Sequence, residues 1–140
     1  MNKKQIVERV KLVGVSFEQF NTQVDERLNN INESLMDETE KKKLKFTQLN
    51  QRRTFRILKT YKISDNIKEI VSNISEQQTW MILSEDWCGD SAQSVPYIYK
   101  ISQLNNLIDL RILYRDDNQN IMEKYLTNGG RAIPKLVAFD

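Results

Sequence analysis

The chain contains no histidine among its 140 residues, and this absence excludes several kinds of catalytic site. A Ser-His-Asp triad, a Cys-His pair, an HExxH zinc site and any imidazole general base all require that residue. The single cysteine, Cys88, cannot form a disulfide within the chain, and one thiol cannot build a cysteine-cluster metal site. Any chemistry therefore depends on Cys88, the carboxylates, the lysines or the hydroxyl groups.

Charge and hydropathy narrow the class of protein further. The 21 basic and 19 acidic side chains give a net charge of +2, and 39% hydrophobic residues suffice for the core of one domain. Residues 1–75 hold 15 basic and 10 acidic side chains, whereas residues 76–140 hold 6 and 9, so the basic excess lies in the first half. It is spread out except at 41–43, and we therefore expect no nucleic-acid partner.

Two further absences bear on location. No apolar run approaches about 18 residues, so we expect no membrane span. No apolar run follows the lysines near the first residue, so we expect no secretory signal. A lone thiol without a signal is typical of a reducing compartment. We therefore expect a cytoplasmic protein that has no membrane partner.

Periodic apolar residues predict helices throughout the first half of the chain. Ser16 and Gln19 have the spacing of a capping box. After this box the apolar positions advance by three or four residues, as in a helix, at Phe17, Phe20, Val24, Leu28, Ile31 and Leu35. Further helices are expected at three places: residues 3–12, residues 41–62 and the residues after Ser64. An alternating pattern at 55–63 leaves a strand open as an alternative there.

The second half alternates short apolar runs with helical patterns. Three runs predict strands, the first of them buried on both faces: residues 79–84, 108–114 and 133–139. The helix between the first two strands covers 90–104 and is interrupted by Pro96. A short helix between the last two begins at Asn118 as its cap, carries Tyr125 and ends at 128–130.

The order of these elements predicts an α/β fold with a partly parallel sheet. Residues 63–140 hold the three strands and are expected to form the core. Residues 1–62 are expected to form an all-helical N-terminal extension. We expect the extension and the core to pack as one compact unit.

The most distinctive segment covers residues 85–91, with the sequence E-D-W-C-G-D-S, between the first strand and the helix that follows. Cys88 stands at the start of that helix, where free backbone N–H groups and the helix dipole favour a thiolate. Gly89 allows a tight turn beside the sulfur, and Ser91 is placed to point its hydroxyl at it. A lone cysteine is often a small buried hydrophobic residue, but this polar turn favours a functional thiol.

Residues 87–91 resemble the thioredoxin-family motif W-C-G-x-C, with serine in place of the second cysteine. Pro96 matches the proline that kinks the active-site helix of that family, and Ile133-Pro134 resembles the family's cis-proline pair, which faces the reactive sulfur. E-D-W-C-G-D and T-N-G-G-R-A-I-P-K are similar to a bacterial branch with a helical N-terminal extension. The resemblance covers residues 64–140 and implies a thioredoxin-like fold, with a central mixed sheet flanked by helices.

Three features depart from that family. No cysteine stands at position 91, so the dithiol cycle cannot close within one chain, and a Cys-x-x-Ser site resembles monothiol glutaredoxins. The aspartate that thioredoxins bury six residues before the cysteine is replaced by Ile82. The hairpin strand and final helix that normally follow the cis-proline strand are lacking. Either the sequence is part of a longer chain, or another element covers the edge of this strand. If the edge is uncovered, we expect self-association.

The resemblance implies thiol–disulfide exchange at a monothiol site. Cys88 is the expected nucleophile, and Ser91 is expected to stabilise its thiolate together with the helix N-terminus. The expected partners are protein thiols or disulfides, or a small thiol such as glutathione as co-substrate, and we expect no resident cofactor and no metal. The substrate-binding residues are expected to be Trp87, Gly89, Asp90, Arg131, Ile133 and Pro134.

Several alternatives stay open on the sequence alone. Arg131 is either a ligand for a carboxylate of the partner or a solvated loop residue. Trp87 is either a lid over the sulfur or part of the packing, whereas Trp80 is expected in the core. The rival to an exchange activity is a non-catalytic thioredoxin-like binding module. A third interpretation is a cysteine-bridged dimer or a metal site formed between two chains.

Overall fold

A central sheet of three strands organises the computed structural model, which describes all residues from 1 to 140. Strand β1 (Gln78–Ser84) lies in the middle, parallel to β2 (Ile108–Tyr114) and antiparallel to β3 (Lys135–Phe139). The sheet is therefore mixed, with β2 and β3 at its edges. This arrangement confirms the predicted fold class, a mixed sheet flanked by helices.

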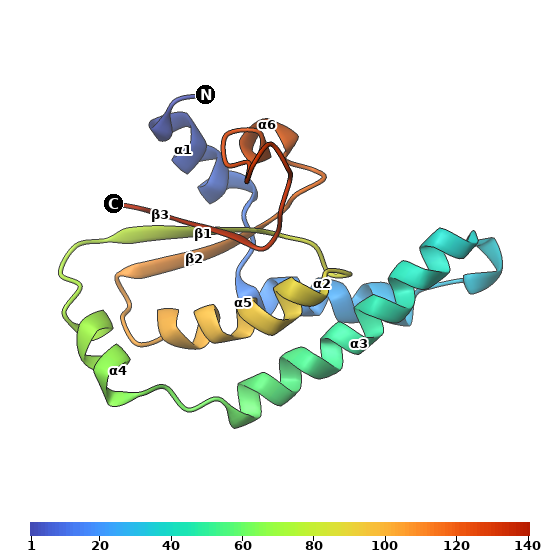
Figure 1. Cartoon of the computed structure of the whole chain (residues 1–140), viewed down its shortest axis with the longest axis horizontal. Helices are drawn as coiled ribbons and strands as arrows, with labels where there is room; N and C mark the ends of the chain where they lie inside the picture. Colours follow the sequence, from blue (N-terminus) through green and yellow to red (C-terminus); the bar gives the residue numbers. More distant parts are fainter.

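Six helices surround this sheet. Their bounds are α1 Lys3–Val13, α2 Phe17–Asn29, α3 Glu38–Thr60, α4 Asp65–Ser72, α5 Gly89–Ser102 and α6 Gln119–Met122. Helices α1 and α6 lie on one face of the sheet, and α2, α3 and α5 lie on the other (Figure 1). None of the helices combines the length and the apolar character that crossing a membrane requires.

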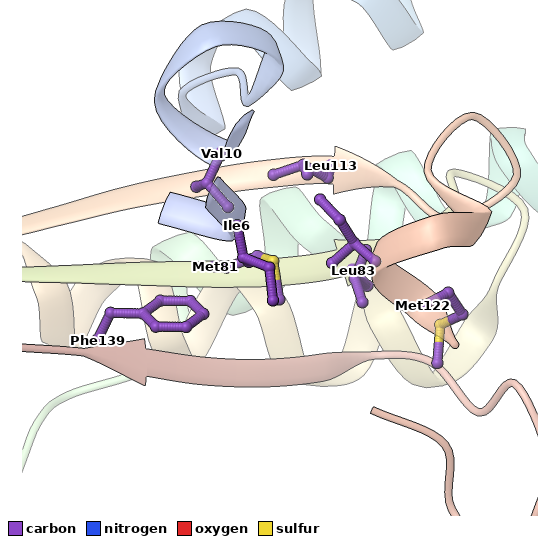
Figure 2. Close-up of a cluster of buried hydrophobic side chains, with 8 residues drawn as sticks. Ile6, Val10, Met81, Leu83, Leu113, Met122 and Phe139 are labelled. Atoms are coloured by element: carbon purple, nitrogen blue, oxygen red, sulfur yellow. The ribbon is translucent and has the colours of Figure 1, made fainter. Parts of the chain in front are cut away.

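The larger hydrophobic cluster lies between the sheet and the face covered by α1 and α6 (Figure 2). Met81 and Leu83 of β1 and Val10 of α1 are completely excluded from solvent there. The other members of the cluster are Ile6, Leu113, Ile121, Met122 and Phe139. Since successive strand residues point to opposite faces, the residue between Met81 and Leu83 must face the other layer.

That residue, Ile82, belongs to a second cluster on the face of α2 and α5. In the strand register it lies between Ile112 of β2 and Leu136 of β3. The cluster consists of Phe17, Ile82, Val95, Leu110 and Ile112. Phe17 of α2 also stacks on Tyr99 of α5, with ring centroids 4.1 Å apart. Strand β1 is thus buried on both faces, and α5 is held firmly against the sheet.

Two predictions about the first half were wrong in detail. Helix α2 ends at Asn29, so the predicted apolar stripe does not continue as helix, and Leu35 is 82% exposed in a short 3₁₀ turn. The side chain of Asn30 donates to the carbonyl of Glu26 at 2.8 Å, and such local hydrogen bonds compete with continued helix. The strand alternative at 55–63 was also wrong, because α3 remains helical to Thr60.

The predicted helix after β2 is much shorter than expected. Helix α6 ends at Met122, well before the predicted end at 128–130. Asn118 is the N-cap of α6 as expected, but its side chain does not cap the helix and instead donates from Nδ2 to the carbonyl of Tyr114 at 2.8 Å. The chain beyond α6 turns tightly, with Asn128 at a positive φ of 51°. Two apolar residues that were assigned to the helix therefore lie outside it: Tyr125 and Leu126.

A short connection joins α1 to α2 along the outer edge of β2. Val15 and Ile112 exchange two backbone hydrogen bonds there, at 2.9 and 2.8 Å. Gly14 precedes this bridge and is buried. A Cβ at Gly14 would lie 2.4 Å from the carbonyl oxygen of Val10 and 2.8 Å from Cβ of Arg111. Glycine is therefore required at this position by lack of space.

We expect Gly14→Ala to lower the free energy of unfolding by about 1–3 kcal/mol, because the added methyl group must displace backbone or strand atoms. Urea unfolding followed by circular dichroism measures the change. Leu12→Ala is the matched control, since Leu12 is 78% exposed in the preceding helix. Its effect should stay within about 0.5 kcal/mol. Equal unfolding midpoints for the two variants would mean that the backbone yields without cost.

Candidate functional site

Cys88 lies where the loop after β1 meets α5, and it forms the N-cap of that helix. Its side chain is half-buried, and its thiol donates to the carbonyl oxygen of Ile133, with Sγ and O 3.8 Å apart. The Ile133–Pro134 peptide bond is cis. Residues from two loops far apart in the sequence therefore meet at the sulfur, in the arrangement that the resemblance implies for Ile133 and Pro134.

Ser91 does not bond to the sulfur as the sequence suggested. The residue is 4% exposed, and its hydroxyl has no hydrogen-bond partner. Ser91 and Cys88 both line a small pocket between α2, α3 and α5. Pro96 lines the same pocket and is buried inside α5, which continues as one helix to Ser102. The pocket behind the sulfur thus holds an unused donor.

Asp86 ties the loop before Cys88 to the N-terminal helices. Its carboxylate forms an ion pair with Arg27 of α2 and accepts a hydrogen bond from Oγ1 of Thr47 in α3 at 3.1 Å. Its carbonyl accepts from Nδ2 of Asn50 at 3.0 Å. The sequence analysis singled out the segment that contains Asp86 but missed these three partners of Asp86. The available signal was the position of two polar residues, Thr47 and Asn50, on the buried face of α3 between Leu44 and Ile57.

Trp87 is half-buried and lies against two cations. The Nζ atom of Lys43 is 5.0 Å from the centre of its ring, and Cζ of Arg115 is 5.3 Å from it. Cations over an indole ring are attracted by its electrons, so the ring is held in place. Trp80, expected in the core, is half-buried against the second cluster, and its Nε1 donates to Gln78 at 2.9 Å.

The remaining predicted site residues differ in their surroundings. Gly89 is the first residue of α5, and Asp90 beside it is exposed without a hydrogen-bond or ion-pair partner. The guanidinium of Arg131 points to α6, where it donates to Gln119 at 3.0 Å and pairs with Glu123 at 3.1 Å. Arg131 is therefore paired within the chain, while its side chain stays exposed.

Glu85 is an acidic site residue that the sequence prediction left out. It is only 8% exposed, and it follows β1 directly. Burial, reinforced by the negative charge of Asp116, raises the pKa of Glu85 to about 7. A carboxyl group thus lies buried in the loop before Cys88, whereas the position six residues before the cysteine holds the apolar Ile82, which is fully buried. No group of three or more acidic or cysteine side chains is placed to hold a metal ion.

A family comparison agrees with this geometry. A model of the thioredoxin family matches residues 36–140, a range that includes α3, the whole sheet and both loops at Cys88. The chain therefore belongs to the thioredoxin family. No curated protein sequence matches it.

Two solved structures are similar to the chain. One is a protein of unknown function, PA1234, from Pseudomonas aeruginosa, with 17% identity and a TM-score of 0.60, where the alignment covers 94% of this chain and 68% of that one. The other is an HIV epitope scaffold, with 17% identity and a TM-score of 0.62 over 95% of this chain and 69% of that one. At this level of identity the likeness extends to the fold alone.

The raised pKa of Glu85 makes stability depend on pH in a defined direction. The folded chain holds a proton that the unfolded chain releases above about pH 4.5, the ordinary value. Stability from this group is thus full at low pH and is lost as the pH rises through about 7. Glu85→Gln should remove the loss and stabilise the protein at pH 8 by roughly 1–3 kcal/mol, with little change at pH 5.

Urea unfolding of both proteins across this pH range measures the difference. The exposed Glu69 of α4 provides the control variant Glu69→Gln, which should follow the wild-type curve at every pH. A Glu85→Gln protein whose stability keeps the wild-type pH dependence would contradict the assignment to this carboxyl group.

Proposed function

We propose that this protein performs thiol–disulfide exchange at Cys88 through mixed disulfides with a small thiol or a protein cysteine. The observation that carries the proposal is the position of the sulfur, at the N-cap of α5 and 3.8 Å from the carbonyl of Ile133 in the cis Ile133–Pro134 pair. The thiolate is the reactive form of cysteine in such an exchange.

The exchange needs Cys88, a partner disulfide and a second thiol from solution. The Cys88 thiol loses its proton to water, and the thiolate attacks one sulfur of the partner disulfide. The partner's S–S bond breaks, its second sulfur leaves as a thiolate that takes up a proton, and a mixed disulfide remains on Cys88. A second thiol from solution then attacks this bond and restores the Cys88 thiolate.

Because position 91 holds serine, the mixed disulfide on Cys88 cannot be released by a second cysteine of the same site. Ser91 occupies the position three residues after Cys88, from which a second cysteine would attack, and a hydroxyl cannot form a disulfide. Release of the partner therefore depends on an external thiol, as in a monothiol site. A free thiol persists in a reducing compartment, and we place the activity in the cytoplasm on this ground.

We expect incubation with oxidised glutathione to add one glutathione to the chain, observed by intact mass, and Cys88→Ser to abolish the adduct. The adduct should be long-lived, so wild type should reduce insulin disulfides with dithiothreitol only slowly. Ser91→Cys should form an internal disulfide and accelerate the reduction by at least about tenfold. The Cα atoms of the two cysteines would lie about one helical turn apart, within the range of ~4.4–6.8 Å that a disulfide tolerates.

The two measurements separate the exchange activity from a binding function. If wild type reduces insulin as fast as Ser91→Cys, the monothiol cycle is wrong. If Cys88 forms no adduct in either protein, the exchange proposal fails. A non-catalytic binding module would then account better for a fold that keeps only one cysteine, Cys88.

A further inference from the structure

We propose that the disulfide partner of Cys88 carries a carboxylate within a few atoms of its sulfur, and that Arg53 of α3 selects it. The inference rests on the proposed function, because it concerns the same sulfur. Arg53 belongs to the long helix that packs along α5, and no feature of the W-C-G motif points to it.

The guanidinium of Arg53 lies at the first residue of α5. Its Nη1 atom is 3.1 Å from the position that a Cβ on Gly89 would take, and Gly89 follows Cys88 directly. A glycine here leaves room for the cation beside the helix start. The charge of Arg53 and the N–H groups at the helix N-terminus therefore lie together at the start of α5, one residue from Cys88.

A chain of hydrogen bonds fixes the guanidinium in this place. Nη1 of Arg53 donates to Oδ1 of Asn50 at 3.0 Å, and Nδ2 of Asn50 donates to the carbonyl of Asp86 at 3.0 Å. The same residue, Asp86, is held by α2 through its ion pair with Arg27. Arg53 is thus coupled to the loop that carries Cys88, and its position follows that loop.

The positive charge of Arg53 has no ion-pair partner within the chain, whereas most other cations around the site have one. Arg27 pairs with Asp86, Arg115 with Asp116 and Arg131 with Glu123. Arg53 forms no ion pair, and neither does Lys43, whose ammonium lies over Trp87. Two free cations from α3 therefore flank the motif.

The negative groups near the sulfur do not cancel this charge. Asp86 is neutralised by Arg27, and the buried Glu85 faces Asp116. Asp90 is exposed, where water screens its charge. On the inner side, the buried hydroxyl of Ser91 has no partner and lines the pocket that Cys88 lines, whereas Arg53 lies outside that pocket. A partner with an anionic group close to its sulfur fits the free charge of Arg53.

The location of Arg53 also limits the size of the selected group. Because the guanidinium stands beside the residue next to Cys88, only a carboxylate a few bonds from the attacked sulfur reaches it. A small disulfide with its own carboxylate meets this condition. In the exchange step, the Cys88 thiolate displaces one carboxylate-bearing thiolate from that disulfide and keeps the other half as the mixed disulfide.

Three small disulfides of similar length and different charge test the selection: dithiodipropionate, which is anionic, hydroxyethyl disulfide, which is neutral, and cystamine, which is cationic. The rate of Cys88 modification is followed by intact mass at low ionic strength. Each rate is divided by the rate of the same disulfide with N-acetylcysteine amide, which removes the intrinsic reactivity of the disulfide. We expect the normalised rate of the anion to exceed that of the neutral compound by about three- to tenfold, and that of cystamine to fall below it.

Arg53→Gln should bring the anionic and neutral rates within about twofold of each other, while Arg53→Lys should keep part of the preference. The matched control is Arg52→Gln, since Arg52 is exposed on the outer face of the same helix and should leave the preference intact. The rate with the neutral disulfide reports whether each variant keeps its fold and its reactive thiol.

The outcomes separate the two proposals. No modification of Cys88 by any of the three disulfides overturns the exchange function itself. Modification by all three at equal normalised rates overturns the selection and leaves the exchange function standing. A preference for the anion that survives in Arg53→Gln also overturns the role of Arg53.

Discussion

The burial of β1 on both faces is the constraint on which the rest of the structure depends. Met81, Ile82 and Leu83 are completely excluded from water, and each such side chain contributes about 1.5–3 kcal/mol only if the layer of helices that it faces is in place. The strand therefore ties α1 and α6 on one side to α2 and α5 on the other. Where this strand ends, the chain passes directly into the loop of Glu85 and Cys88, so the site stands on the most deeply buried element.

The N-terminal helices are part of the site as well as of the core. Arg27 binds the carboxylate of Asp86, and Asn50 binds its backbone carbonyl. Lys43 lies over the ring of Trp87. Helices α2 and α3 therefore hold the loop before the cysteine. In this protein the surroundings of the sulfur are therefore built largely by residues outside the motif. The family match, which begins at residue 36, includes α3 and thus most of these contacts.

Local sequence patterns predicted most helices and strands, but they did not predict the polar contacts between residues far apart in the sequence. The apolar run at 79–84 and the box of Ser16 and Gln19 depend on near neighbours, and the structure has both where they were expected. Helix α6 was predicted too long, because the apolar spacing of residues 121–126 does not report that the chain leaves the helix after Met122. The engagement of Arg131 with Glu123 and the anchoring of Asp86 join residues 8 to 59 positions apart, and such pairs leave no periodic trace.

The bridge at Val15 has a consequence for how copies of this chain can associate. It occupies the outward N–H and carbonyl of Ile112 in the middle of β2, so this part of the edge is already paired. While the connection between α1 and α2 stays in place, a strand of another copy cannot pair along the whole length of β2. The same short connection that joins two helices thus also interrupts the edge at which a foreign strand would have to begin.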